Sequence, residues 1–326
     1  MNHVLTKNKM LSSTQKFYSD VIKGLKSSPK SMSSKYFYDQ QGDQIFQQIM
    51  AMDEYYLTDC EMEILKEQAA EISRTITSDK SPFDLIELGA GDATKSIHLL
   101  RQLVTEGHDF RYMPIDISEN VISNLETKLP QALPELHMTG LNGDYFDMLN
   151  RASEISDRRK VVLFMGANIG NMTVTEARAF CAELKSYLAP DDLLIIGFDL
   201  KKNPHQILAA YSDKQGITKS FNINLLHRIN RELGGDFETG NFDHYASYDP
   251  ESGACKSYLI SLTDQVVRLG DTESVSFLKN EHIYMEISQK YSLQEINQLM
   301  SGLEFAHVKN FFDSGKMFVD SIWKMK

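Results

Sequence analysis

Residues 84–100, DLIELGAGDATKSIHLL, restrict this chain to a small number of folds. The short apolar run 85–88 ends at Gly89, which is typical of a buried parallel strand, and residues 95–100 have helical character. A glycine turn lets the backbone approach a ligand, and the following helix directs its free N–H groups towards it. The turn has Thr94 where the dinucleotide fingerprint requires a third glycine. The segment therefore predicts either a nucleotide-binding Glu-x-Gly-x-Gly turn or a purely structural connection.

Between about residues 84 and 199, apolar strand candidates alternate with helical stretches. The strands are expected in DLIELG, RYMPIDIS, LHMTGLNGDYF, VVLFMGANIGN and DLLIIGFDL. Helical periodicity is clearest at 119–129 and 173–188, where Thr173 can cap a helix with Glu176. This alternation predicts βαβ units around a parallel sheet. The final segment, FAHVKNFFDSGKMFVDSIWKM, predicts an antiparallel hairpin, which suits a methyltransferase sheet better than a dehydrogenase sheet.

The segments before residue 84 and after residue 199 do not show this alternation of strands and helices. Residues 1–35 are polar and rich in Ser and Lys, with SSPKSMSS expected as a loop. Amphipathic helix is expected at 44–50 and from residue 61. HQILAAYSDKQGITKSFNINLLHRINRELGG predicts two helices, and YASYDPESGACKSYLISL predicts a hairpin that turns at 250–253.

Composition excludes several classes of protein. The net charge of −11 argues against a general nucleic-acid or anionic-membrane binder, since both depend on basic patches. No apolar run approaches the roughly 20 residues that cross a bilayer. The three cysteines, Cys60, Cys181 and Cys255, are odd in number and scattered, and the nine histidines form no metal-ligand cluster. We therefore expect a soluble, cytoplasmic protein without a metal site.

Two aspartates follow successive strands of the predicted sheet. Asp116 ends RYMPID at the distance from the glycine turn where an acid accepts hydrogen bonds from both ribose hydroxyls, although it could instead cap the next helix together with Ser118. Asp144 could accept from an adenine amine or serve as a turn residue. Ligands of open α/β sheets bind at the carboxyl ends of strands, so these residues point to one nucleotide site. The missing third glycine and the final hairpin favour S-adenosylmethionine over NAD as its ligand.

Several longer segments resemble one family, the histidine-specific, S-adenosylmethionine-dependent Nα-methyltransferases of ergothioneine biosynthesis. They are KYFYDQQGDQIF, DEYYLTDCEMEIL, IELGAGDATKS, PIDIS, GANIGN, LAAYSDKQGITKSFNINLLHRINRELGGDF and MEISQKY. The resemblance implies an α/β fold whose Rossmann-like class I methyltransferase domain, with its C-terminal antiparallel hairpin, comprises residues 66–199 and 289–326. It further implies a second, α+β substrate-binding domain comprising residues 1–65 and 200–288.

The resemblance also implies which residues form the site. The expected cofactor contacts are Glu87, Gly89, Gly91, Lys95, Asp116 and Asp144. Asn171 and Tyr211 would hold the carboxylate and amine of the amino acid, with Tyr56 and Tyr38 in the same pocket. Thr218 and Phe221 would lie near the reacting nitrogen.

Glu286 and Ser288 would recognise the imidazole, and their i, i+2 spacing places them on one face of a strand. A carboxylate accepts from the ring N–H, and a hydroxyl can serve the other nitrogen. Structural roles stay open for several of these residues: Asn171 as a turn residue, Tyr56 as a core aromatic and Glu286 as a solvated carboxylate.

Two departures from the family pattern bear on the substrate. Leu57 and Asp59 stand where the family commonly has a proline and a cation, in YYPTR. Ser257 aligns with a methionine packed beside the substrate ring, so the smaller side chain leaves room for a bulkier substrate or a water. Glu286 and Ser288 are retained, and histidine therefore stays the favoured substrate.

The implied reaction is an in-line displacement in which a neutral α-amine attacks the sulfonium methyl group, up to three times, to give the betaine. Such a step needs near-attack geometry and a pocket that tolerates positive charge, which aromatic faces provide. Alternatives are N-methylation of another amino acid or small amine, a non-catalytic sensor of S-adenosylmethionine or amino acid, and a nicotinamide oxidoreductase. We expect a monomer whose partner is a small-molecule substrate, an amino acid, with no nucleic-acid or membrane partner.

Overall fold

The computed structural model describes the backbone of residues 2–326 and the side chains of residues 14–326. The chain divides into two compact units. The large unit comprises Leu57–Lys202 and Gln289–Lys326, and the small unit comprises Met1–Tyr56 and Asn203–Ser288. The sequence-based boundaries were expected at residues 65, 199 and 288.

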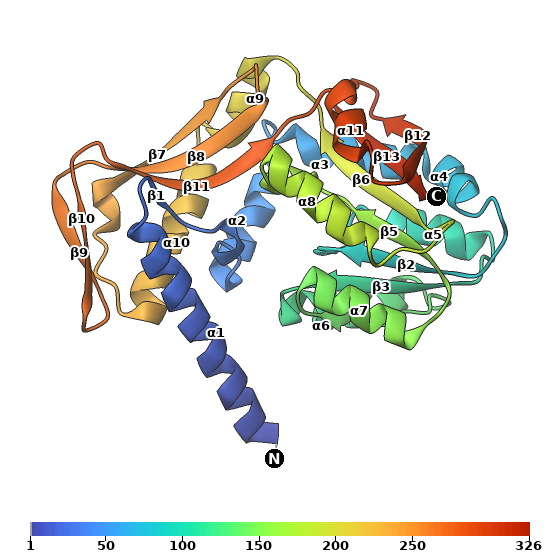
Figure 1. Cartoon of the computed structure of the whole chain (residues 1–326), viewed down its shortest axis with the longest axis horizontal. Coiled ribbons are helices and arrows are strands. Elements are labelled where there is room, and N and C mark those ends of the chain that lie inside the picture. The colour runs from blue at the N-terminus through green and yellow to red at the C-terminus, as the bar shows by residue number, and fades with distance from the viewer. Residues whose placement is uncertain (1) are drawn as a thin grey trace. The chain divides into compact units, whose positions relative to one another are not determined.

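A seven-stranded mixed sheet forms the large unit, in the order β12-β13-β6-β5-β2-β3-β4 (Figure 1). Its strands are β2 (Phe83–Leu88), β3 (Phe110–Asp116), β4 (Leu141–Asn142), β5 (Arg159–Phe164), β6 (Leu193–Asp199), β12 (Phe305–Phe312) and β13 (Phe318–Met325). β2 through β6 run parallel, whereas β13 pairs antiparallel with both β6 and β12. The predicted methyltransferase-like α/β sheet with a C-terminal antiparallel hairpin is thus confirmed.

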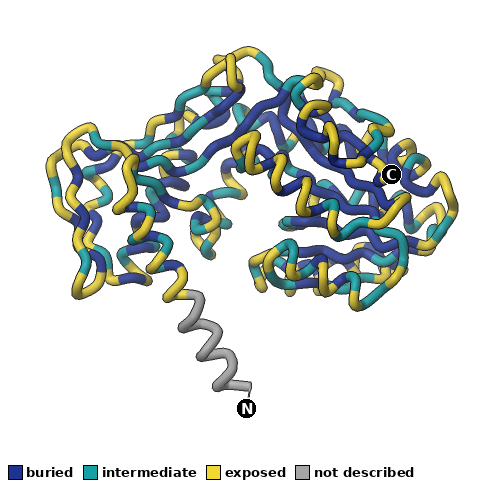
Figure 2. Tube along the Cα trace, in the orientation of Figure 1, coloured by how far each residue is buried: buried dark blue, intermediate teal, exposed yellow. Residues whose placement is uncertain are grey.

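Every residue of β2 and β6 is buried, which explains why these strands are nearly continuous apolar runs (Figure 2). One face of the sheet packs against α7 (Tyr145–Ile155), α8 (Val174–Lys185) and α11 (Leu293–Met300) through a single apolar cluster. The remaining helices of this unit are α3 (Tyr56–Glu67), α4 (Ala69–Ile76), α5 (Ile97–Thr105) and α6 (Glu119–Ala132), with the 3-10 turn η2 (Asn168–Asn171). The predicted capping box of Thr173 and Glu176 is present at the start of α8.

The small unit contains a four-stranded mixed sheet in the order β1-β11-β8-β7 and a separate hairpin. The strands are β1 (Lys30–Ser31), β7 (Phe242–Tyr248), β8 (Ala254–Ser261), β9 (Gln265–Leu269), β10 (Glu273–Phe277) and β11 (His282–Gln289). The helices are α1 (Asn2–Leu25), α2 (Gln40–Met50), α9 (Pro204–Tyr211) and α10 (Ile217–Leu233), with the 3-10 turns η1 (Ser34–Tyr36) and η3 (Thr239–Asn241). The two helices predicted after residue 204 and the β7–β8 hairpin are confirmed.

One helix was not predicted, and one expectation requires correction. Residues 2–25 form helix α1, for which no prediction was made; Phe17, Val21 and Leu25, spaced by four, bury one stripe of it in the core of the small unit. The strand expected in LHMTGLNGDYF is only two residues long. Gly140 and Gly143 flank β4, and glycine disfavours extended strand, which explains the short pairing.

Within the described part of the chain, no helix is both long enough and apolar enough to cross a bilayer.

Candidate functional site

The glycine turn after β2 is closely packed at Gly89 and has free space at Gly91. Gly89 and Gly91 have φ of +73° and +55°, a region that glycine adopts without strain. A Cβ on Gly89 would lie 2.8 Å from the hydroxyl oxygen of Tyr145, so no side chain fits there. A Cβ on Gly91 would meet no described atom within 4 Å, so this side of the turn has space for a ligand.

Asp116, at the end of β3, is tied to the same turn. Its carboxylate accepts the backbone N–H of Gly91 at 3.2 Å and that of Ser118 at 2.9 Å. Burial raises the pKa of Asp116, and the two N–H donors partly offset this effect. Ser118, rather than Asp116, caps α6 by accepting the N–H of Val121. The ribose contact of Asp116 stays a prediction.

Asp144 lies after β4 and is exposed. It is the N-cap residue of α7 and accepts the N–H of Phe146 at 3.1 Å. The capping role is therefore present in the structure, and the adenine contact stays a prediction.

Glu87 and Lys95 lie on either side of the glycine turn. The Tyr112 hydroxyl donates to Glu87 at 2.5 Å, and burial raises the pKa of the Glu87 carboxyl to about 7. Lys95 precedes α5, which begins at Ile97 and not at the expected residue 95. The Lys95 ammonium forms an ion pair with Glu61, a residue that the sequence analysis did not select.

Asn171 ends η2, in the turn that follows β5, and its side chain is exposed. The turn is entered through Gly166 and Ala167, both with positive φ. A Cβ on Gly170 would lie 2.9 Å from the carbonyl oxygen of Gln289, so this position of GANIGN is packed against backbone. In the large unit, the predicted residues therefore gather at the carboxyl ends of β2, β3, β4 and β5, where α/β sheets bind ligands.

In the small unit, the structure brings together two predicted substrate residues. The hydroxyl groups of Tyr211, at the end of α9, and Ser288, on β11, are hydrogen-bonded at 2.7 Å. Glu286 lies two residues earlier on β11 and is half-buried. Ser257, on β8, is only 1% exposed, and β8 is the neighbour of β11 in the sheet.

An aromatic cluster surrounds Phe221, which projects from the first turns of α10. Its ring centroid lies 5.7 Å from that of Tyr38, 5.8 Å from that of Phe46 and 4.9 Å from that of Phe37. The ring of Tyr55 lies 6.2 Å from that of Tyr211. Tyr38 is 39% exposed, so the cluster is open at this ring.

Phe46 was missed as a site candidate. It belongs to the motif KYFYDQQGDQIF, but only its packing against Tyr38 and Phe221 reveals its place in the cluster. Its spacing on α2 predicts only an amphipathic helix. The motif itself was therefore the one available signal.

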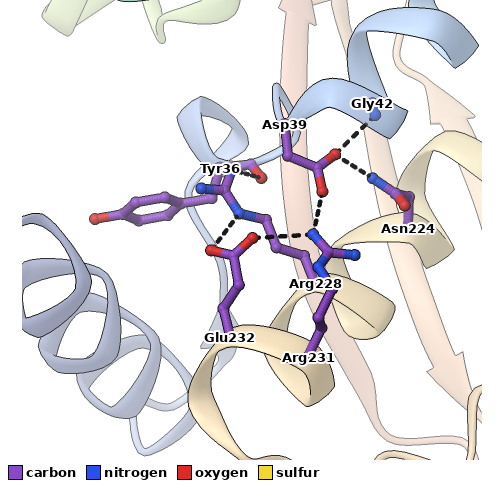
Figure 3. Close-up of polar contacts among 7 residues, drawn as sticks. All are labelled: Tyr36, Asp39, Gly42, Asn224, Arg228, Arg231 and Glu232. Atoms are coloured by element: carbon purple, nitrogen blue, oxygen red, sulfur yellow. Dashed lines mark hydrogen bonds and ion pairs between the residues drawn. The ribbon is translucent and has the colours of Figure 1, made fainter. Parts of the chain in front are cut away.

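A polar network holds the Tyr38 segment to α10 (Figure 3). The Asp39 carboxylate accepts the Gly42 N–H at 2.7 Å, the Asn224 amide at 2.8 Å and the Arg231 guanidinium at 2.5 Å. Burial alone would raise the pKa of Asp39, but these hydrogen bonds outweigh it and hold the pKa below its usual value. Asp39 therefore positions Tyr38 relative to the helix that carries Phe221.

The remaining predicted residues lie at helix starts. Thr218 is buried in the first turn of α10, and its N–H donates to Asp213 at 2.8 Å. Tyr56 is the first residue of α3, and Leu57 continues this helix without the family's proline. Within residues 14–326, no group of three His, Cys, Asp or Glu side chains could hold a metal ion.

Comparison with known proteins adds a family assignment. A family model described as histidine-specific methyltransferase, SAM-dependent, matches residues 17–325. The chain is 31% identical to the histidine N-alpha-methyltransferase of Mycobacterium tuberculosis, and the match covers 92% of each chain. It is 32% identical to the protein of the same name from Mycolicibacterium smegmatis, over 85% of each chain.

A more distant relative carries another name. The chain is 27% identical to the 4-dimethylallyltryptophan N-methyltransferase of Claviceps fusiformis, over 86% of this chain and 83% of that one.

Proposed function

The chain belongs to the family of histidine-specific, S-adenosylmethionine-dependent methyltransferases, and from this premise we propose that it methylates the α-amine of L-histidine three times in succession to give the trimethylated betaine. It is an S-adenosylmethionine-dependent N-methyltransferase. We assign cofactor binding to the large unit, as a class I methyltransferase domain, and the amino acid contacts, Asn171 excepted, to the small unit.

The residues of the large unit fit the cofactor. The open side of Gly91 allows close approach to the backbone, and Asp116 and Asp144 present carboxylates after β3 and β4. We assign Asp116 to the ribose hydroxyls and Asp144 to the adenine amine, because a carboxylate accepts hydrogen bonds from both kinds of donor. When bound, S-adenosylmethionine supplies the activated methyl group.

The observation that carries the substrate proposal is the hydrogen bond between Tyr211 and Ser288. It joins a residue assigned to the amino acid's backbone groups to one assigned to its imidazole. Glu286, on the same strand, can accept the imidazole N–H. We assign Asn171 to the carboxylate and amine together with Tyr211, and Tyr56 to the wall of the same pocket.

The aromatic cluster supports successive methylation. Each transfer increases the positive character of the nitrogen, and the faces of Phe221, Phe46 and Tyr38 attract a quaternary ammonium. Thr218 precedes Phe221 by one helical turn. These residues need only orient a neutral amine and exclude water, because methyl transfer requires little acid–base assistance.

A mass-spectrometric survey tests the proposal. The purified protein is incubated with S-adenosylmethionine and all twenty amino acids, and products with one, two or three added methyl groups are counted. Trimethylated histidine as the main product is expected. Methylation of another amino acid with histidine untouched would contradict the substrate assignment, and cofactor binding without any product would favour a sensor.

A second candidate substrate class is a larger amino acid. Ser257 is small and buried where the family pattern has a methionine, and the relative from Claviceps fusiformis is named for a substituted tryptophan. If space beside Ser257 admits a larger ring, Ser257→Met abolishes that activity and retains histidine methylation. Ser257→Ala serves as the control that leaves the space unchanged.

A further inference from the structure

The geometry points to Glu61 as a positioning residue for the cofactor, a buried carboxylate of α3 that holds Lys95 and the 166–171 turn in one arrangement. The inference rests on the proposed function only in taking Lys95 as a cofactor contact. Glu61 itself lies on α3 and has no assigned role in the reaction.

The two oxygens of Glu61 serve different segments. Its side chain is 0% exposed. Oε2 accepts from the Lys95 ammonium, in the segment between the glycine turn and α5. Oε1 accepts the Gly166 N–H at 2.7 Å, at the start of the turn that ends in Asn171. One carboxylate thus connects α3, the glycine turn and the turn after β5.

The sheet has room for this carboxylate because position 197 is a glycine. A Cβ on Gly197 would lie 2.5 Å from Oε1 of Glu61, so any side chain there would displace the carboxylate. Ile196 and Phe198 belong to the apolar cluster under α7, α8 and α11. Side chains alternate along a strand, so Gly197 faces the opposite side of the sheet.

Two further carboxyl groups share that side. Val319 of β13 also belongs to the apolar cluster, so Asp320, paired with Gly197, faces away from it. Glu87 of β2 alternates with Ile86 and Leu88 in the same way. Lys95 therefore faces three carboxyl groups, those of Glu61, Glu87 and Asp320.

These groups differ in charge. Burial and the neighbouring charge of Glu61 raise the pKa of Asp320 well above its usual value. Asp320 is 0% exposed, and neither of its oxygens has a hydrogen-bond partner among the described residues. For Lys95, burial lowers the pKa, but Glu61, with smaller contributions from Asp320 and Glu87, outweighs burial and the net pKa is raised. Glu61 is therefore the group that contributes most to keeping Lys95 charged.

Loss of the Glu61 charge removes the ion-pair partner of the half-buried Lys95 ammonium and leaves beside it Glu87 and Asp320, two carboxyl groups whose neutral forms burial favours. A half-buried lysine that loses its ion-pair partner releases its proton more readily or moves towards water, and either change removes the cation from the cofactor site. Glu61→Gln makes this change while keeping an oxygen that can accept the Gly166 N–H.

The test measures the dissociation constant of S-adenosylhomocysteine by calorimetry between pH 7 and pH 9.5. Glu87 and the α-amine of the ligand titrate in this range in both proteins, so the ratio of the two dissociation constants is compared at each pH. Glu61→Gln is expected to bind at least tenfold more weakly than wild type at pH 7, and this ratio is expected to grow as pH rises and Lys95 loses its proton. A purely structural role would lower the melting temperature without producing this pH dependence.

Asp84→Asn is the matched control. Asp84 is 3% exposed and pairs with Arg111 at 3.2 Å, at the opposite end of β2. Its neutralisation also removes a buried carboxylate charge, yet affinity is expected to stay within twofold of wild type. Equal losses in Asp84→Asn and Glu61→Gln, or a ratio of Glu61→Gln to wild-type dissociation constants that does not change with pH, would overturn the inference.

Gly197→Ala tests the same geometry without altering any ionisable group, and it serves if Glu61→Gln does not fold. It is expected to weaken binding of S-adenosylhomocysteine, as Glu61→Gln does. Wild-type affinity in Gly197→Ala would contradict the inference. The binding of S-adenosylhomocysteine is measured without any amino acid, so the inference can fail while histidine is methylated, and it can hold if histidine is not the substrate.

Discussion

Replacement of Asp39 by alanine should destabilise the small unit by a predictable amount, because three donors lose their acceptor together. The cap at Gly42 contributes about 1 kcal/mol, the buried amide of Asn224 about 1.5 kcal/mol, and the half-exposed Arg231 pair at most about 0.5 kcal/mol. We expect Asp39→Ala to lower the free energy of unfolding by about 3 kcal/mol. Asp39→Asn, which keeps an oxygen acceptor, should lose about 1 kcal/mol.

Urea unfolding followed by circular dichroism measures these values. Asp20→Ala is the control in the same unit, since Asp20 accepts from Lys35 and Tyr36 at a more exposed position, and it should lose less than about 1 kcal/mol. The pKa of Asp39 is lowered in the folded protein, so its contribution is complete above the unfolded value of about 3.9 and disappears as pH falls through the folded value. A loss of under about 1 kcal/mol in Asp39→Ala would refute the reasoning.

Three further predictions concern the site. Tyr211→Phe removes the hydroxyl bonded to Ser288 and should lower kcat/KM for histidine about tenfold, whereas the exposed Tyr245→Phe should leave it unchanged. Glu87 stays protonated in the folded protein up to a pKa of about 7, so apo stability should fall by about 3 kcal/mol as pH rises from about 4 to 7, and Glu87→Gln should remove this slope in unfolding titrations. Phe46→Leu should slow the third methyl transfer several-fold more than the first, measured as the ratio of dimethylated to trimethylated product, and Phe46→Tyr should restore it.

The parts of the fold that the sequence predicts are those with local signals. The sequence predicts β2 and β6 because a strand that is buried on both faces is a short apolar run. It predicts the start of α8 because the capping box at Thr173 lies within four residues. The helix of residues 2–25 is not readable in this way. Its buried stripe depends on partners from α10, which lie about 200 residues later.

The site residues also divide into those with a local sequence signal and those without one. Gly89, Gly91 and Asp116 form a recognisable pattern because a strand, a tight turn and a following strand end impose fixed spacings. The part played by Glu61 depends on the space above Gly197 in a distant strand, and no spacing in the sequence encodes it. Residues that act by packing against a neighbour, or by their charge on it, can therefore be identified only from the structure.

The small unit also has a consequence for how the chain is made. β1 pairs through Lys30 with Ile283 of β11, about 250 residues later. At 5–20 residues per second, a ribosome needs roughly 10–50 s to synthesise the intervening chain. During that time the apolar stripes of α1 and α2 emerge without the core that covers them, while the βαβ units of the large unit can form in order. The first 56 residues are thus the segment of the nascent protein that most needs protection by chaperones, and expression yield should respond to changes there before it responds to changes in the sheet.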